Sequence, residues 1–390
     1  MRACVERRRD RTGFDMREKI QQAHPYPEVG VPLFWPFGLA LELEETALQT
    51  VDKTVRFLRE VEKTQAGNEP PQWTTRNRVA LDLPTLALRE FSQGTGTPVL
   101  VLPPYAGHSS TIADFQAHQS LIATLLANGC SSVYAADWRS ATPEMRFYNI
   151  GNYLAEIDLC VHELGNRVQL VGLCQGGWCA AMYAARFPGK VVRLVIAGAP
   201  IDTDAGDGAI KLAAHTLPMR FYEDLVQSGD GLLQGRYMLE GFKNLHPVAQ
   251  YFDKFVELYE RIDDPDYVRR FEQFERWYEY TLDLPGTWYL QVIDQLFKQN
   301  RLARGEFVAL GKTLDLHDIT CPTYLLAGEH DQITPKAQVF AAKSLVGTNP
   351  QEIFEAVANG GHIGLFMGQR ALRENWKPIA RWLAGHVQAK

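Results

Sequence analysis

The strongest pattern along the chain is a series of short, continuous apolar runs separated by stretches with helical spacing. The runs predict strands at 98–102, 132–136, 168–171, 191–197, 323–327 and 352–355. Apolar residues at every position are typical of parallel strands that are buried on both faces. Stretches at 121–128, 150–164 and 178–187 have the length of crossover helices. The pattern therefore predicts an α/β fold with a mostly parallel sheet flanked by helices.

One long interval, residues 202–316, breaks this rhythm. It is rich in aromatic and charged residues and predicts helices at 221–227, 247–261, 266–280 and 287–299. The strand pattern returns only at Thr323. A helical insertion between two late strands normally sits over the carboxyl ends of the strands, where ligands bind. We therefore predict that 202–316 is a helical cap and that 76–201 and 317–390 together form the core.

The segment before the core is predicted to be a tail followed by a helix. An aromatic stretch, Phe34-Trp-Pro-Phe37, precedes apolar residues at helical spacing up to Val61. Runs at 79–83 and 86–91 then resemble an antiparallel pair of strands. We assign residues 1–75 to this N-terminal region, which either packs on the core or docks on another surface.

Composition restricts the classes of function. With 390 residues and 46% hydrophobic content, the chain is large and apolar enough to fold around a core. A formal charge of −6 argues against nucleic acid as the main ligand. No apolar run reaches the ~18 residues of a membrane helix, and the basic start lacks the apolar stretch of a secretory signal. Six scattered cysteines without a CxxC pair predict reduced thiols, neither disulfides nor a metal site. We expect a cytoplasmic protein without a transmembrane segment.

The most informative motif is Gly172-Leu-Cys-Gln-Gly176, which joins a predicted strand to a predicted helix. Its spacing is that of a nucleophile elbow, with Cys174 in place of serine. Gly172 and Gly176 lack the side chains that would collide in such a tight turn. The helix N-terminus would also favour the thiolate of Cys174. The alternative is a core cysteine beside a glycine-rich turn.

Two later residues favour the catalytic interpretation. Asp331 follows the strand at 323–327, and His362 follows the strand at 352–355. Nucleophile, acid and histidine thus appear in the order of hydrolase triads. We predict that His362 takes the thiol proton and that Asp331 fixes its tautomer, with Glu329 and His330 as less favoured acids.

An oxyanion hole is expected from backbone N–H groups near Cys174. One donor is predicted to be Gln175, and the other comes from the loop after the strand at 98–102, at Tyr105 or Ala106. His108, in the same loop, is expected at the rim of the pocket.

These motifs resemble those of polyhydroxyalkanoate synthases of the α/β-hydrolase superfamily, which carry a cysteine where lipases carry serine. The likeness runs from about Val99 to Leu383 and includes Asp137-Trp138 and Gly360-Gly-His-Ile-Gly364. It is strongest to the short catalytic subunits of two-component synthases. The loop Pro103–Ser110 departs from the synthase pattern, which usually carries an asparagine there, and the N-terminal region also differs.

The resemblance implies a Cys–His–Asp site that forms a covalent hydroxyacyl thioester, with Cys174, Asp331 and His362 in those roles. It implies no cofactor. The expected substrates are a hydroxyacyl-CoA or a polyester, and the expected partners are a polymer granule surface, a second subunit or another copy of the chain.

Three functions fit these residues. If the acyl acceptor is a hydroxyl of another hydroxyacyl unit, the enzyme is a synthase; if it is water, the enzyme is an intracellular depolymerase or esterase. A third interpretation is a catalytically idle relative that binds granules or a partner. Large aromatic residues of the cap are expected partly to pack on the core and partly to line an apolar channel above Cys174: Phe271, Phe274, Trp277, Tyr278, Trp288, Tyr289 and Phe297.

Overall fold

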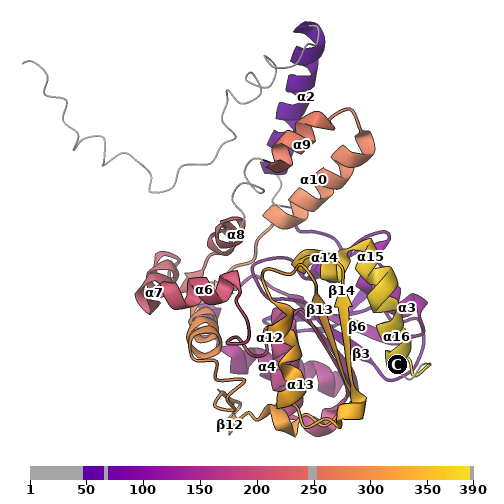
Figure 1. Ribbon diagram of the computed structural model, residues 1–390, viewed down its shortest axis with the longest axis vertical. Helices are drawn as coiled ribbons and strands as arrows, with labels where there is room; N and C mark the ends of the chain where they lie inside the picture. Colours follow the sequence, from indigo (N-terminus) through magenta and orange to yellow (C-terminus); the bar gives the residue numbers. More distant parts are fainter. Residues whose placement is uncertain (1–46, 66–68, 245–252, 387–390) are drawn as a thin grey trace, which may run out of the picture.

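An eight-stranded sheet forms the centre of the computed structural model, which describes residues 47–65, 69–244 and 253–386. The strand order is β1-β2-β6-β3-β7-β8-β13-β14, in which β1 and β2 are antiparallel and the six strands from β6 onward are parallel (Figure 1). The strands are β1 Arg78–Asp82, β2 Leu86–Glu90, β3 Val99–Leu102, β6 Val133–Trp138, β7 Val168–Leu173, β8 Val191–Ala197, β13 Thr323–Gly328 and β14 Ile353–Ala358. This arrangement confirms the predicted α/β-hydrolase fold.

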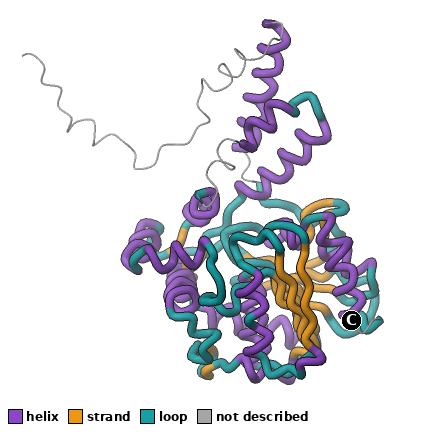
Figure 2. The backbone as a smooth tube through the Cα atoms, in the orientation of Figure 1, coloured by secondary structure: helices purple, strands orange, loops and turns teal. Residues whose placement is uncertain are grey.

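Helices cover both faces of the sheet (Figure 2). Those of the core are α3 Leu121–Ala127, α4 Ile150–Glu163, α5 Gln175–Arg186, α12 Lys336–Phe340, α13 Ala342–Leu345, α14 His362–Met367, α15 Gln369–Ala371, the π-helix η8 Leu372–Trp376 and α16 Lys377–Leu383. Short 3₁₀ turns connect them at η1 Ser110–Ala113, η2 Pro143–Met145, η3 Pro188–Lys190, η6 Leu316–Asp318 and η7 Pro350–Glu352. A small ribbon of β4 Asp114–Gln116 and β5 Gln119–Ser120 lies between η1 and α3.

Alternate residues of each central strand enter two different hydrophobic cores. Leu100 and Leu102 of β3 belong to the core that contains α4 and α5, whereas Val99 and Val101 belong to the core that contains α3 and α16. All four are fully buried. Because successive side chains of a strand point to opposite faces, a continuous apolar run buries both.

The insertion after β8 is mainly helical. Its helices are α6 Ala209–Thr216, α7 Met219–Ser228, α8 Gly235–Lys243, α9 Lys254–Glu260, α10 Pro265–Glu279, α11 Gly286–Gln291 and the π-helix η5 Val292–Lys298. Two-residue strands pair as β9 Leu232–Leu233 with β10 Leu284–Pro285, and β11 Val308–Ala309 with β12 Lys312–Thr313. Helices α7, α9, α10 and α11 match predicted helices, whereas α6 and α8 were not predicted.

The helix α2, Ala47–Gln65, packs against this insertion. Phe57 and Val61 form a separate hydrophobic cluster with Leu258, Tyr259 and Ile262, next to α9 and α10. The three helices project together beyond the sheet (Figure 1). The Phe34–Phe37 stretch lies outside the described residues, and the division of the chain at residues 75, 201 and 316 stays a prediction.

Candidate active site

Cys174 occupies the sharp turn between β7 and α5. Its backbone has φ 51° and ψ −118°, a conformation that residues other than glycine rarely adopt. The N–H of Cys174 donates to the Ala197 carbonyl at 2.8 Å, and its own carbonyl accepts from the Gly177 N–H at 2.8 Å. The residue is 9% exposed. These contacts hold the strained turn, which is the geometry expected of a nucleophile elbow.

The two glycines of the motif are required by close approach. A Cβ atom at Gly172 would collide with the backbone of Gly176 and Gly177. One at Gly176 would collide with the carbonyl oxygen of Leu102, at the end of β3. The elbow therefore packs closely against the start of the loop after β3. This packing brings together the two segments from which the oxyanion-hole N–H groups are predicted to come.

Asp331 and His362 form a direct contact at the carboxyl ends of β13 and β14. Nδ1 of His362 lies 2.7 Å from Oδ2 of Asp331. The other carboxylate oxygen, Oδ1, accepts from the N–H groups of Ile333 at 3.0 Å and Thr334 at 2.8 Å. The Asp331 side chain is fully buried. With both oxygens occupied, the carboxylate is fixed, and it accepts the Nδ1 proton of the imidazole.

The two flanking residues considered as alternative acids are not placed in this way. Glu329 and His330 are exposed, and Glu329 pairs with Lys336 at 2.8 Å. Their backbone N–H groups instead donate to the carbonyls of Ala358 and Gly360, which ties the Asp331 loop to the loop that carries His362.

Charges at the site act strongly on His362. Burial alone would lower its pKa, but the Cys174 thiolate and the Asp331 carboxylate oppose burial and raise the pKa to about 10. A side-chain hydrogen bond with Cys174 acts in the same direction. While Cys174 is a thiolate, the imidazole is therefore protonated at neutral pH. One hydrogen bond links Cys174 to His362, and a second links His362 to Asp331.

The other cysteines of the described part of the chain are in different surroundings. Burial raises the pKa of the Cys130 and Cys160 thiols to about 12 and that of Cys321 to about 11. The pKa of Cys179 is raised still further by burial. Cys4 lies outside the described residues.

The predicted oxyanion donors come from the expected elements. Gln175 is the first residue of α5, so its N–H has no carbonyl one helical turn earlier to bond to. Tyr105 and Ala106 are buried in the loop after β3, and the Tyr105 hydroxyl donates to the Asp283 carbonyl at 3.1 Å. The oxyanion role of these three residues stays a prediction.

A short segment of the insertion pairs with this loop. The Leu282 N–H donates to the Gly107 carbonyl at 2.8 Å, and His108 forms an isolated antiparallel bridge with Thr281. The Asp283 carboxylate accepts from the Gly235 N–H at 2.8 Å, which ties this segment to the first residue of α8. Sequence reasoning did not single out Asp283, which lies in no recognisable motif.

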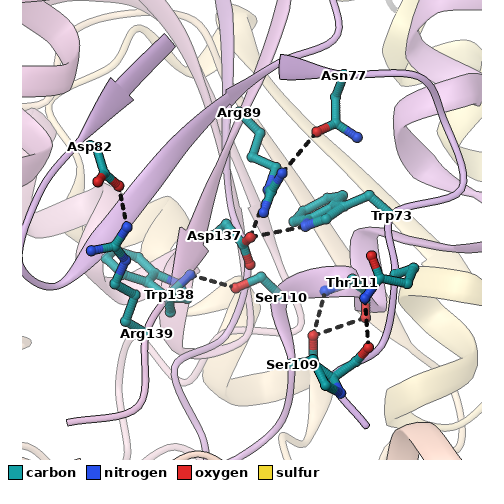
Figure 3. A network of polar contacts seen from close by, with 12 residues as sticks. Trp73, Asn77, Asp82, Arg89, Ser109, Ser110, Thr111, Asp137, Trp138 and Arg139 are labelled. Carbon is teal, nitrogen blue, oxygen red and sulfur yellow. Dashed lines mark hydrogen bonds and ion pairs between the residues drawn. The ribbon is translucent and has the colours of Figure 1, made fainter. Parts of the chain in front are cut away.

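Polar contacts support the same loop from the side of the sheet (Figure 3). The Ser110 hydroxyl accepts from the Trp138 N–H at 2.9 Å. Asp137, the residue before it in β6, accepts from Arg89 Nε at 2.7 Å and from the Trp73 indole at 3.0 Å. The Asp137-Trp138 pair therefore anchors the loop and the segment before β1 to the end of β6.

Comparisons with known proteins assign the chain to a family. The family model described as "Protein of unknown function (DUF3141)" matches residues 87–383. The poly(3-hydroxyalkanoate) polymerase subunit PhaC of Allochromatium vinosum is 31% identical over 293 residues, which cover 73% of this chain and 81% of that protein. The chain belongs to the DUF3141 and poly(3-hydroxyalkanoate) polymerase families. The PhaC subunit of Synechocystis is 28% identical over 366 residues, covering 90% of this chain and 95% of that one. The solved monoacylglycerol lipase of Paleococcus ferrophilus has a TM-score of 0.49 and 18% identity, over 77% of this chain and 99% of that one.

This membership confirms the resemblance predicted from the sequence, and the polymerases among the relatives identify an enzyme of the acyltransferase or α/β-hydrolase type. Within the described residues, none of the helices has both the length and the apolar character needed to span a bilayer.

Proposed function

We propose that this chain transfers 3-hydroxyacyl groups through Cys174, as a polyhydroxyalkanoate synthase-like enzyme with a covalent acyl-cysteine intermediate. The observation that carries the proposal is the placement of Cys174 on a strained elbow whose hydrogen-bond partner, His362, is held by Asp331. An ordinary buried cysteine needs neither a strained backbone nor a histidine oriented by a carboxylate.

In the first step the Cys174 thiolate attacks the carbonyl carbon of a 3-hydroxyacyl-CoA. A carbon–sulfur bond forms and an electron pair moves to the carbonyl oxygen, where the backbone N–H of Gln175 and one from Tyr105 or Ala106 stabilise it. When the carbonyl re-forms, the bond to CoA breaks. The leaving thiolate takes the proton from the His362 imidazolium, so that CoA departs as a neutral thiol.

In the second step His362 works in the opposite direction. The hydroxyl of another hydroxyacyl unit gives its proton to His362 and attacks the carbonyl carbon of the acyl-cysteine. A new ester bond forms and the Cys174 thiolate leaves, which restores the initial ion pair. Throughout, Asp331 keeps the Nδ1 proton in place and stabilises the imidazolium.

A transfer role is supported by the relatives, which are named as poly(3-hydroxyalkanoate) polymerases. An acyl-cysteine is itself a thioester, close in energy to the CoA thioester, so it passes its acyl group onward readily. The same residues would release a free hydroxy acid if water replaced the hydroxyl acceptor. Cytoplasmic location, binding to a granule surface, a partner subunit and a second copy of the chain belong to this proposal as predictions.

The test supplies the full chain with 3-hydroxybutyryl-CoA and, separately, with amorphous polyester. We expect free CoA, growing polymer and a mass increase of one hydroxybutyryl group on the peptide that contains Cys174. Cys174→Ala should abolish all three, whereas Cys321→Ala, a matched change at a partly buried thiol, should keep them. Soluble hydroxy acids without polymer would indicate a depolymerase or esterase, and no product from either substrate would favour a catalytically idle relative.

A further inference from the structure

Trp138, the last residue of β6, contacts the loop after β3 at three points. Its indole N–H donates to the Pro103 carbonyl at 2.8 Å, where the loop begins. Its backbone N–H donates to the Ser110 hydroxyl at 2.9 Å, where the loop ends (Figure 3). Between these points its ring packs against the ring of Tyr105, with centroids 5.8 Å apart. Trp138 is 5% exposed, so all three contacts are shielded from water.

The Pro103 carbonyl lies directly beside the nucleophile elbow. A Cβ atom at Gly176 would come within 2.8 Å of this oxygen, in addition to its collision with the Leu102 carbonyl. Gly176 follows Gln175, one of the predicted oxyanion donors. The indole of Trp138 therefore holds the start of the loop against the first turn of α5.

The connection from Pro103 to the other predicted donors is short and stiff. Pro103 and Pro104 carry no N–H, and their rings fix φ at about −65°, so the first N–H groups of the loop belong to Tyr105 and Ala106. Within the described part of the chain, the bond from the Trp138 indole is the one hydrogen bond to a main-chain atom of these four residues. The two N–H groups thus have no protein partner there, although both residues are buried. Such groups are uncommon, and an oxyanion would satisfy them.

The later part of the loop is held by the cap. The Gly107 carbonyl accepts from the Leu282 N–H at 2.8 Å, and His108 stacks on Trp277 of α10 with ring centroids 5.2 Å apart. His108 therefore lies against an aromatic residue of the cap and not at an open rim, where the sequence placed it. With the later part fixed in this way, the orientation of the first peptide groups depends on the end of the loop that the Trp138 indole holds.

We propose that the Trp138 indole N–H positions the second oxyanion donor, the N–H of Tyr105 or Ala106, relative to the N–H of Gln175. Trp138 acts through the loop and not on the substrate, so it is a positioning residue. The inference rests on the proposed function in one respect, because it requires that Cys174 attack a carbonyl carbon. Oxyanion donors act at about 2.7 to 3.1 Å, so a small shift of the loop weakens one of them in the transition state. The thiolate and His362 stay as they were.

The test compares two reactions of Cys174 in the full chain. Acylation by 3-hydroxybutyryl-CoA, or by the simple ester p-nitrophenyl acetate, places negative charge on a carbonyl oxygen. In the reaction with methyl methanethiosulfonate the thiolate attacks sulfur, an S–S bond forms and methanesulfinate leaves, so no oxyanion develops. Both rates are measured by rapid quenching and mass of the peptide that contains Cys174.

Trp138→Phe keeps an aromatic ring and removes the N–H. We expect it to slow acylation by about 10- to 100-fold, somewhat less than the roughly 10²- to 10³-fold loss that follows removal of a whole donor. KM and the rate with methyl methanethiosulfonate should stay unchanged. Ser110→Ala, which removes the hydroxyl at the other end of the loop, should slow acylation alone and by a smaller factor.

Trp73→Phe is the matched control. It removes an indole N–H that donates to Asp137, the residue before Trp138, and Asp137 keeps its bond from Arg89 Nε. Both reactions should then run at the wild-type rates.

Equal slowing of both reactions by Trp138→Phe would mean that the indole acts on the thiolate or on the fold, and an unchanged acylation rate would mean that the loop keeps its donors in place without the indole. Either result refutes the inference. If thermal unfolding shows that Trp138→Phe does not fold, the same two rates in Ser110→Ala decide. Acylation of the wild type by the ester but not by the thioester would refute the proposed function, and the ester rates would still decide this inference. Acylation by neither would refute both.

Discussion

The Asp331→Asn variant changes one oxygen of the site to an amide nitrogen and leaves the volume of the side chain almost unchanged. The loop decides how the amide is oriented. The N–H groups of Ile333 and Thr334 point at Oδ1, so the amide oxygen will stay there and the amide NH₂ will face His362. In the reverse orientation the amide NH₂ would face the N–H groups of Ile333 and Thr334. Donor would then meet donor, and the two hydrogen bonds from these N–H groups would be lost.

With an NH₂ group facing it, Nδ1 of His362 must act as the acceptor. The imidazole proton then moves to Nε2, the nitrogen that the mechanism needs free for the proton of the thiol or of the acceptor hydroxyl. The variant also removes one of the two charges that raise the pKa of His362. In a serine hydrolase the equivalent change lowers kcat by about 10⁴. A thiol depends less on its base, so we expect a loss of about 10² to 10⁴, or about 3 to 5 kcal/mol in activation free energy.

The assay is single-turnover acylation of Cys174 by 3-hydroxybutyryl-CoA, followed by intact mass. Glu329→Gln is the matched control, because Glu329 lies two residues before Asp331 in the sequence but is exposed. Its carboxylate forms an ion pair with Lys336 and makes the same acid-to-amide change testable outside the site. It should leave the rate unchanged, and thermal unfolding should show that both variants fold. A folded Asp331→Asn variant that acylates at the wild-type rate would refute the role given to the Asp331–His362 contact.

Three further outcomes follow from the described geometry. A limiting amount of a thiol reagent should label Cys174 before Cys130, Cys160 and Cys321, whose pKa values burial raises to about 11 or 12; peptide mapping that finds equal labelling would contradict the assignment. Gly176→Ala should destabilise the fold by about 1 to 3 kcal/mol or more in denaturant titration, because its Cβ would meet the Leu102 carbonyl, whereas Gly364→Ala enters open space and should cost little. The pKa of His108 falls from 6.5 to about 4 on folding, so between these pH values the unfolded chain binds one proton more than the folded chain. The free energy of unfolding should therefore decrease by a few kcal/mol as the pH falls from 6.5 to about 4. His108→Phe should flatten this part of the curve, and an unchanged curve would show that His108 is not held neutral.

The parts of the fold that sequence could predict are those with a local signal. Each central strand is apolar at nearly every position because both its faces are buried, and all eight strands lie within a few residues of the predicted ranges. The elbow was recognisable because a strained turn with close backbone contacts requires glycine at two fixed positions. Asp331 and His362 were recognisable because each directly follows such a strand.

Other features depend on contacts between residues far apart in the chain, for which a single sequence carries no local sign. The packing of α2 on the insertion includes an ion pair between Arg56 and Asp263, at 2.7 Å. The stack of His108 on Trp277 likewise joins a core loop to a cap helix. In neither pair does the sequence separation of the two residues indicate that they are in contact. The helices α6 and α8 were missed because they are short, at eight and nine residues. Neither has a side-chain N-cap, which is the usual sequence signal for the start of a helix.

Two strands that lie side by side, β8 and β13, are made at very different times during synthesis. Leu194 is opposite Thr323, yet the whole insertion is translated between them. A growing chain therefore carries Cys174 on a finished strand long before Asp331 and His362 leave the ribosome. Closing so long a loop into a parallel pairing is slow, so the last two strands should join six strands that have already paired. Until they do, the nascent protein holds Cys174 without His362, the residue proposed as its base, and we expect a prematurely terminated chain to be unable to begin the proposed acyl transfer.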